Sequence, residues 1–204
     1  IEWERPIAHL DTSKIHFYIK EDSVLTPIKG SIEKDKDPYY PRQYKLVGDF
    51  KTDIFYQVDI DSAAFYDYYG NHNNAIEVLF RIKPIDNYAT FTLNVKNIEG
   101  EAFVEMITKT DEVIRREQVK NNMAKFIHIT PGEYFFRLIE DKNGNGLWDT
   151  GDYSQGLPPE YVYYLPKRIK FRKNWDVEEE WDVKEIPLEK QRPSDLAISK
   201  KQSK

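Results

Sequence analysis

Residues 133–152 read EYFFRLIEDKNGNGLWDTGD, an apolar run that leads directly into a loop rich in glycine, asparagine and aspartate. Within the run, Tyr134, Phe136 and Leu138 recur at every second position, so in an extended chain their side chains point to one face. Aromatic residues at this period favour a β-strand over a helix. The stretch therefore predicts a strand with one buried face, followed by a turn-forming loop.

The same alternation recurs on both sides of this stretch, and helical periodicity is rare. Ile76, Val78 and Phe80 face one way, for example, while Glu77 and Arg81 face the other. Further runs of this kind lie at residues 15–20, 54–60, 90–95 and 169–172. Short alternating runs separated by turn signals are typical of β-sandwiches. We therefore expect an all-β fold with two Ig-like or prealbumin-like β-sandwich domains in tandem.

A break in the pattern at residues 83–87 suggests a domain boundary. Pro84 lies in this break, and proline cannot donate a hydrogen bond to a sheet. We place an Ig-like sandwich at residues 1–85 and a prealbumin-like or CNA-B-like sandwich at residues 86–188. Residues 189–204 are polar, rich in lysine and without periodicity, which predicts a disordered tail.

The loop at residues 141–152 has the spacing of a calcium site. Calcium is a hard cation that binds about six to eight oxygen ligands, and a loop of about twelve residues supplies them from its first, third, fifth, seventh, ninth and last positions. Gly146 occupies the sixth position, where a sharp turn needs a residue without Cβ. The candidate metal ligands are Asp141, Asn143, Asn145, Leu147 through its backbone carbonyl, Asp149 and Asp152.

Two features separate this loop from the helix-flanked form of the motif. The last position holds Asp152 in place of glutamate, and this shorter carboxylate reaches a cation through one oxygen or through water, which predicts modest affinity. A strand precedes the loop, which predicts a structural clip between strands and not a sensor that opens helices. The alternative interpretation is a turn rich in asparagine and glycine that binds no ion.

The composition excludes several classes of protein. The chain has no cysteine, which rules out disulfides and thiolate zinc sites. Its net charge of −5 gives no electrostatic footprint for nucleic acid. No apolar run approaches the ~20 residues that span a bilayer. Because the chain starts at Ile1 without a signal peptide, we expect a piece of a longer exported polypeptide whose anchor lies upstream.

A group of tyrosines in a predicted loop of the first domain is a second candidate site. Tyr66, Tyr68 and Tyr69 precede amide side chains within residues 71–74. Exposed aromatic rings beside amides can stack on sugar rings or form a protein-binding patch. The alternative is that these tyrosines cap the end of the sandwich. No nucleophile-elbow, P-loop or dinucleotide motif is present, so we expect no catalytic residues and no enzyme activity.

The sequence also resembles known surface proteins. The run at residues 131–134, followed by residues 137–141 and the loop, resembles the prealbumin-like or CNA-B-like repeats of bacterial surface proteins, which carry calcium loops. A wider pattern resembles the C-terminal region of Bacteroidetes Ig-like-domain lipoproteins, and it consists of the loop, Pro159-Glu160, Tyr163-Tyr164 and Asn174–Glu178. The stretches that resemble a bacterial Ig-like domain are Tyr44–Leu46, Tyr56–Ile60, Asp61–Ala63 and Asp67–Asn71.

This resemblance implies an exported lipoprotein at the cell surface or outer membrane, and it brings no catalytic residues with it. We therefore expect a monomeric, non-catalytic structural or interaction module whose second domain is made rigid by calcium. Its partner would be a protein or a glycan at the cell surface. The alternative function is that of a glycan-binding accessory protein at the cell surface.

Overall fold

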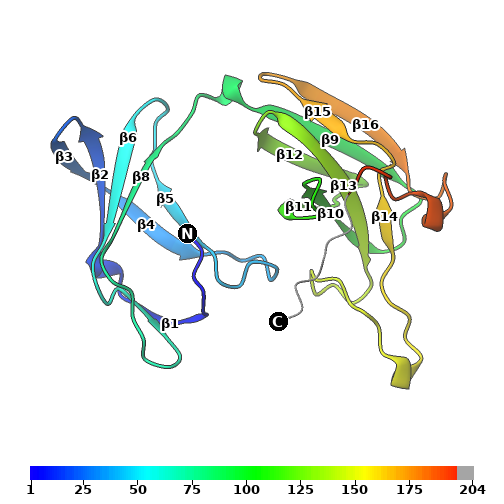
Figure 1. Ribbon diagram of the computed structural model, residues 1–204, viewed down its shortest axis with the longest axis horizontal. Coiled ribbons are helices and arrows are strands. Elements are labelled where there is room, and N and C mark those ends of the chain that lie inside the picture. The colour runs from blue at the N-terminus through cyan, green and yellow to red at the C-terminus, as the bar shows by residue number, and fades with distance from the viewer. Residues whose placement is uncertain (197–204) are drawn as a thin grey trace. The chain divides into compact units, whose positions relative to one another are not determined.

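The computed structural model describes residues 1–196, and the regular elements in this range are strands and short 3₁₀ helices (Figure 1). The prediction of an all-β fold is confirmed. Contacts between residues group the chain into two compact units, of which the first ends at Pro84 and the second begins at Ile85. Within the described range, no helix is both long enough and apolar enough to cross a membrane.

The first unit consists of antiparallel strands. Its largest sheet has the order β3-β2-β6-β8, while β4 pairs with β5 and β1 pairs with β7. A 3₁₀ turn, η1 (Thr12–Lys14), leads into β2. The strands are β1 (Ile7–Leu10), β2 (Ile15–Glu21), β3 (Val24–Ile28), β4 (Gly30–Lys34), β5 (Tyr44–Gly48), β6 (Phe55–Ile60), β7 (Phe65–Asp67) and β8 (Ile76–Arg81).

The alternation seen in the sequence puts the apolar faces of these strands into one core. Phe17 of β2 pairs with Val58 of β6, which in turn pairs with Val78 of β8. Phe65 of β7 belongs to the same core. The ring of Trp3 packs on Phe65 with 4.2 Å between centroids, so the N-terminal segment is fixed beside β7.

The second unit consists of two sheets. In one, β9 lies between β12, to which it is antiparallel, and β16, to which it is parallel. The other has the order β11-β10-β13-β14, and β15 also pairs with β13. The elements are η2 (Ile85–Asn87), β9 (Ala89–Lys96), β10 (Glu101–Ile107), β11 (Val113–Gln118), β12 (Met123–Ile129), β13 (Gly132–Asp141), η3 (Tyr153–Gln155), β14 (Val162–Tyr164), β15 (Ile169–Phe171), β16 (Asp176–Asp182) and η4 (Leu188–Lys190).

Side chains from both sheets share one core, in the manner of a β-sandwich. Phe91 of β9 and Phe136 of β13 meet with 4.6 Å between ring centroids, and Leu93 and Val104 have no exposed surface. The strand predicted around residues 133–140 is β13, which pairs with β10, β14 and β15. The loop that follows therefore starts from a strand supported by pairing on both edges.

The first part of the tail that the sequence predicts to be disordered is ordered. Gln191 is 2% exposed, and its Nε2 donates to the carbonyls of Val183 and Ile186, at 2.7 Å each. Leu196 is buried in a small apolar cluster. The polar composition of the segment concealed these contacts, because one glutamine and one leucine supply them. Residues 197–204 of the predicted tail lie outside the described residues.

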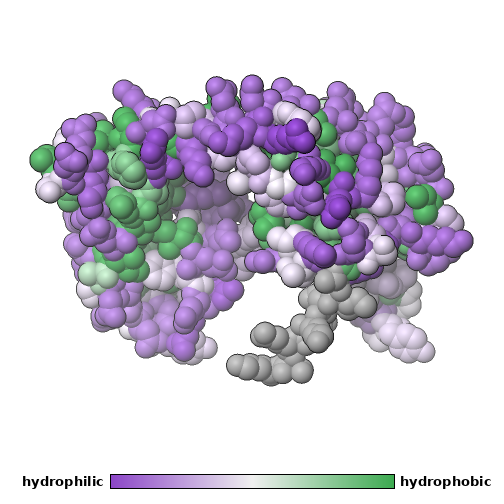
Figure 2. Space-filling view, turned by 45° about the horizontal axis from the view of Figure 1, so that its top comes forward, coloured by the Kyte–Doolittle hydropathy of each residue, from purple (hydrophilic) through white to green (hydrophobic). Residues whose placement is uncertain are grey.

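The surface visible in Figure 2 is mostly hydrophilic and carries separate hydrophobic patches. In the first unit, Phe55 of β6 and Leu79 of β8 are 48% and 52% exposed. Single exposed apolar side chains are ordinary on protein surfaces. These two residues therefore do not by themselves define a site.

Candidate metal centre

The candidate loop begins at the C-terminal end of β13 (Figure 1). Its first residue, Asp141, is buried. Its Oδ1 accepts a hydrogen bond from the N–H of Asn145 at 3.1 Å, and its Oδ2 accepts one from Gly146 at 2.7 Å. Gly144 and Gly146 have φ angles of 69° and 73°, in the left-handed region that favours glycine. One buried carboxylate and two glycines thus fold residues 141–146 into a tight turn.

Four other predicted ligands lie in the same loop. The Nδ2 atoms of Asn143 and Asn145 donate to one atom, Asp149 Oδ2, at 2.7 and 2.8 Å. The N–H of Asn145 is also shared between Asp141 Oδ1 and Asn143 Oδ1. Leu147 joins through its N–H, which donates to Asn145 Oδ1 at 2.7 Å. We call the oxygen-bearing side chains of Asp141, Asn143, Asn145 and Asp149 the cation cluster, after the role that the spacing predicts for them.

Asp152, the predicted last ligand, is engaged outside the cation cluster. Its Oδ1 accepts the N–H and the hydroxyl of Ser154, at 2.8 and 2.6 Å. Its Oδ2 accepts the Nε2 of Gln155 at 2.8 Å. The hydrogen bonds from Ser154 hold the pKa of the Asp152 carboxyl below its usual value. The structure therefore gives Asp152 the role of N-cap of η3, for which aspartate is a preferred residue.

Glu160 closes the loop, and the spacing pattern did not identify it. Its side chain is buried, with Oε1 accepting the N–H of Lys142 at 2.8 Å and Oε2 accepting that of Asp149 at 3.0 Å. Its carbonyl accepts the indole N–H of Trp148 at 3.1 Å. Glu160 lies beyond the twelfth position, so only the Pro159-Glu160 pair in the family resemblance pointed to it. It holds both ends of the turn.

The donor set fits a hard cation. Every side chain in the cation cluster offers oxygen, which calcium prefers, and none offers nitrogen or sulfur of the kind that selects zinc. A carboxylate or amide oxygen has two acceptor positions, so each oxygen that accepts a backbone N–H keeps one for a metal. No three histidine, cysteine, aspartate or glutamate side chains gather as a metal site within residues 1–196. Two of the four side chains in the cation cluster are asparagine amides, so the cluster contains only two carboxylates.

One basic side chain reaches the turn from the sheet. The Nη2 of Arg116, on β11, donates to the carbonyl of Gly146 at 2.7 Å. Its Nε lies 3.2 Å from Glu105 Oε1, and its guanidinium lies 3.8 Å from the centroid of the Phe103 ring. Glu105 is shared between two arginines, since its Oε2 accepts a hydrogen bond from Arg137 Nε at 2.6 Å. The contact with the loop therefore fixes the backbone of the turn at Gly146.

The three tyrosines of the second candidate site do not form one group. Tyr68 and Tyr69 are 75% and 82% exposed. Tyr66 is half-buried, and its ring lies between His9 and His72, with centroid distances of 6.2 and 5.6 Å. Only Tyr68 and Tyr69 are therefore free to meet a ligand face-on.

Comparison with known proteins adds little to this geometry. No protein-family model matches the chain, and no curated protein matches it in sequence. Among solved structures it is similar to the Bacillus anthracis TIE protein, with a TM-score of 0.31 and 10% sequence identity over 84% of this chain. The match covers 34% of the TIE protein, so this chain spans about a third of its length.

Proposed function

We propose that this chain is a non-catalytic structural or interaction module of an exported, cell-surface lipoprotein, and that calcium bound in the cation cluster makes its second unit rigid. The observation that carries the proposal is the joining of Asn143 and Asn145 to a single oxygen of Asp149, beside the buried carboxylate of Asp141. An Asn/Gly turn without a ligand function needs no such convergence of two side-chain amides on one carboxylate.

Calcium would supply one fixed centre of charge for these oxygens. Asp141 and Asp149 would bind it through their carboxylates, and Glu160, beyond the loop, would hold Asp149 in place by accepting its N–H. The segment between β13 and β14 would then be held at Asp141 and at Asp149, which is itself bonded to Glu160. An ion that binds only the folded state stabilises that state by RT ln(1 + c/Kd), where c is the concentration of free calcium.

The expected affinity supports a location outside the cell. The cation cluster has two carboxylates and two amides, and Asp152 is engaged elsewhere. Few charged ligands favour weak binding, and extracellular calcium modules work with a Kd of about 10⁻⁴–10⁻³ M. The family resemblance is the other support for export and for a lipoprotein anchor. Labelling intact cells with an antibody against this chain tests the location by itself.

Thermal melting tests the calcium site. We expect about 10 mM calcium, roughly ten times the weaker end of that Kd range, to raise the Tm of the second unit by roughly 5–10 °C over excess chelator. Asp149→Asn keeps the size of the side chain but removes one charge from the cluster, and it should abolish most of this rise. Identical wild-type melting curves in calcium and in chelator would contradict the proposal.

A further inference from the structure

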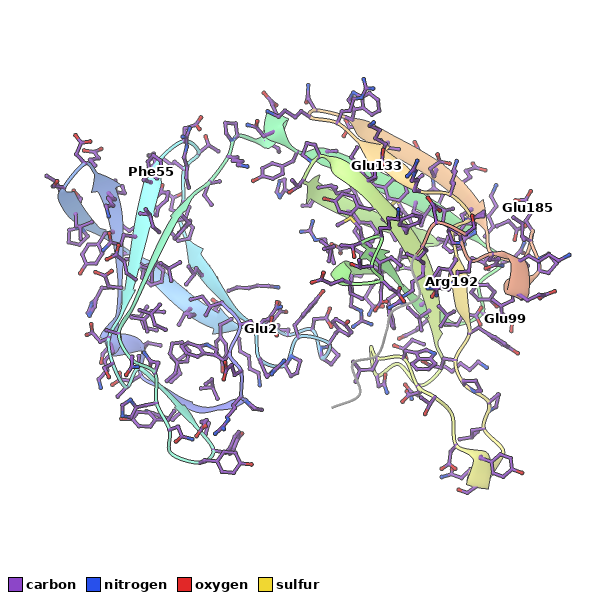
Figure 3. All side chains as sticks on the ribbon, viewed as in Figure 1. Glu2, Phe55, Glu99, Glu133, Glu185 and Arg192 are labelled. Atoms are coloured by element: carbon purple, nitrogen blue, oxygen red, sulfur yellow. The ribbon has the colours of Figure 1, made fainter. Side chains whose placement is uncertain are left out.

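Two adjoining hollows lie in the first unit, far in sequence from the cation cluster. One, of about 670 Å³, is lined by the N-terminal segment, by β7 and by the turn at residues 71–74. The other, of about 630 Å³, is lined by Pro6, Tyr68 and Tyr69. Arg5 and Asp67 line both. Together the two hollows form the Arg5 hollow, with Glu2 at its N-terminal side (Figure 3).

Arg5 is an exposed arginine held in one place. Its Nη1 lies 3.3 Å from Asp67 Oδ2, and the side chain of Asp67 is 8% exposed. Asp67 is itself fixed, because it accepts the Nδ2 of Asn71 at 2.9 Å and the N–H of Tyr69 at 2.8 Å. These bonds, that of the Asn71 side chain first, lower the pKa of Asp67 to about 2. Arg5 thus presents its remaining N–H donors on a rigid, charge-balanced support.

An aromatic surface stands beside these donors. The guanidinium of Arg5 lies 5.6 Å from the centroid of the Tyr69 ring. Tyr68 and Tyr69 are the two most exposed large hydrophobic side chains of the first unit. An aromatic face binds the C–H face of a sugar ring, and planar donors beside it bind the ring's hydroxyls. Pockets with apolar walls and a few fixed polar groups are the usual form of such sites.

The turn at residues 71–74 adds polar groups on a rigid backbone. The Asn73 side chain accepts the N–H of Phe65 at 2.8 Å and donates to the carbonyl of Asp61 at 2.8 Å, so it holds the turn to β7. Its neighbours His72 and Asn74 are exposed and line the hollow. The amide of Asn74 and the imidazole of His72 are thereby presented to a ligand by a backbone that is already ordered.

The floor of the hollow contains an unused donor. Trp3 lines it, and the indole Nε1 of Trp3 is buried with no hydrogen-bond partner among residues 1–196. A buried N–H without an acceptor is unusual in folded proteins and costs free energy. Because this nitrogen has almost no exposed surface, it marks a polar group beneath the hollow and not a contact that a ligand makes in this structure.

The charge of the hollow selects among sugars. Glu2 and Glu4 line it. Glu2 pairs with Arg42 at 3.4 Å and Arg5 pairs with Asp67 at 3.3 Å, which leaves the charge of Glu4. The local balance is therefore negative, which disfavours uronic acids, sialic acids and phosphorylated ligands. A neutral sugar meets no such penalty.

From these observations we infer that the Arg5 hollow binds a neutral oligosaccharide, with Tyr68 and Tyr69 as the stacking platform and Arg5 as the central hydroxyl-binding group. Tyr66, whose ring lies between two histidines, takes no part. This inference goes beyond the proposed calcium function and does not depend on it. Binding should therefore be the same in calcium and in chelator.

A glycan array tests the inference on the whole chain. It should carry neutral oligosaccharides of hexose and N-acetylhexosamine units beside versions that bear uronic or sialic acid. We expect binding among the neutral probes only. The strongest of them is then titrated by calorimetry against the wild type, Tyr69→Ala and Arg5→Ala. Each substitution should weaken binding by about tenfold or more, which corresponds to the loss of one good stacking or hydrogen-bonding contact.

Two further variants serve as controls for this test. Tyr69→Phe retains the ring, and its Kd should lie within about threefold of the wild-type value. That difference is less than half the free energy expected for the loss of one such contact. Tyr153→Ala removes a fully exposed tyrosine of the second unit and should bind as the wild type does. Unchanged melting of the first unit shows that each variant is folded. Absence of binding to every neutral probe, or binding that Tyr69→Ala and Arg5→Ala leave unchanged, overturns the inference.

Discussion

Two hydrogen bonds join Glu160 and Asp149. The N–H of Asp149 donates to Glu160 Oε2 at 3.0 Å, and the N–H of Glu160 donates to the carbonyl of Asp149 at 3.0 Å. The second oxygen of Glu160 accepts the N–H of Lys142 at 2.8 Å. The buried carboxylate of Glu160 therefore links Lys142 at the start of the loop to Asp149 and to the segment that leads into β14.

Replacing Glu160 should destabilise the second unit even without calcium. Glu160→Ala leaves the N–H groups of Lys142 and Asp149 without their acceptor, which we expect to cost ~2 kcal/mol of unfolding free energy. Glu160→Gln keeps one acceptor oxygen and should cost less. Urea denaturation in excess chelator measures both values. The matched control is Glu185→Ala at an exposed position (Figure 3). Equal urea midpoints for Glu160→Ala and Glu185→Ala would show that the Glu160 carboxylate does not hold the loop.

The spacing pattern and the structure give Asp152 different roles. The pattern makes it the last calcium ligand, whereas its carboxylate caps η3. We therefore expect Asp152→Asn to keep the calcium-induced rise in Tm, while Asp149→Asn loses it. Both variants remove one negative charge, so a general charge effect would reduce the rise equally in both. Loss of the rise in Asp152→Asn alone would restore the ligand role that the spacing predicts.

The sequence was informative where a regular pattern was present. Period-two alternation identified β2, β6, β8 and β13, because one buried face makes a strand visible in sequence. The spacing of glycine, asparagine and aspartate pointed to the loop at residues 141–152, and calcium binding by that loop stays a prediction. Glu160 was missed because its contact with Lys142 spans a separation that no periodicity marks. The Arg5 hollow was likewise hidden, since it joins the N-terminal segment to the turn at residues 71–74.

The C-terminal segment is a second case in which the sequence pattern did not reveal specific contacts. Its composition predicts disorder, but the Gln191 side chain accepts the N–H of Tyr164 at 3.1 Å and donates to two carbonyls. Its neighbour Arg192 donates to the hydroxyl of Tyr164 at 2.9 Å (Figure 3). A few specific bonds order a segment whose average composition is polar.

Gln191→Ala should therefore lower the stability of the second unit. It removes one acceptor and two donor bonds at a buried position, which we expect to cost roughly 2–3 kcal/mol. Lys190→Ala, at the exposed preceding position, should change the unfolding free energy little. Limited proteolysis provides a second readout, because the wild type should resist cleavage near residue 191 and Gln191→Ala should not. If both variants unfold and cleave like the wild type, the segment is not part of the fold.

Asp67 makes the stability of the first unit depend on acidity within a defined range. Its pKa is lowered from 3.8 to about 2 by hydrogen bonds, that of the Asn71 side chain first. A lowered pKa means that ionised Asp67 stabilises the folded state fully above about pH 3.8, and that this contribution is lost as the pH falls towards about 2. Asp67→Asn removes the ionised form. It should thus be less stable than the wild type by a constant amount at neutral pH, and the difference should shrink only below the unfolded value.

Urea titrations followed through the amide NMR signals of Phe17 and Val58, both buried in the first unit, measure this difference at each pH. Asp61→Asn is the control, since Asp61 is exposed and lies in the same unit. A difference between Asp67→Asn and the wild type that begins to shrink well above the unfolded value would mean that Asp67 is not held by the Asn71 turn. The rigid support of Arg5 would then be lost with it, and the sugar-binding inference would have to rest on the tyrosines alone.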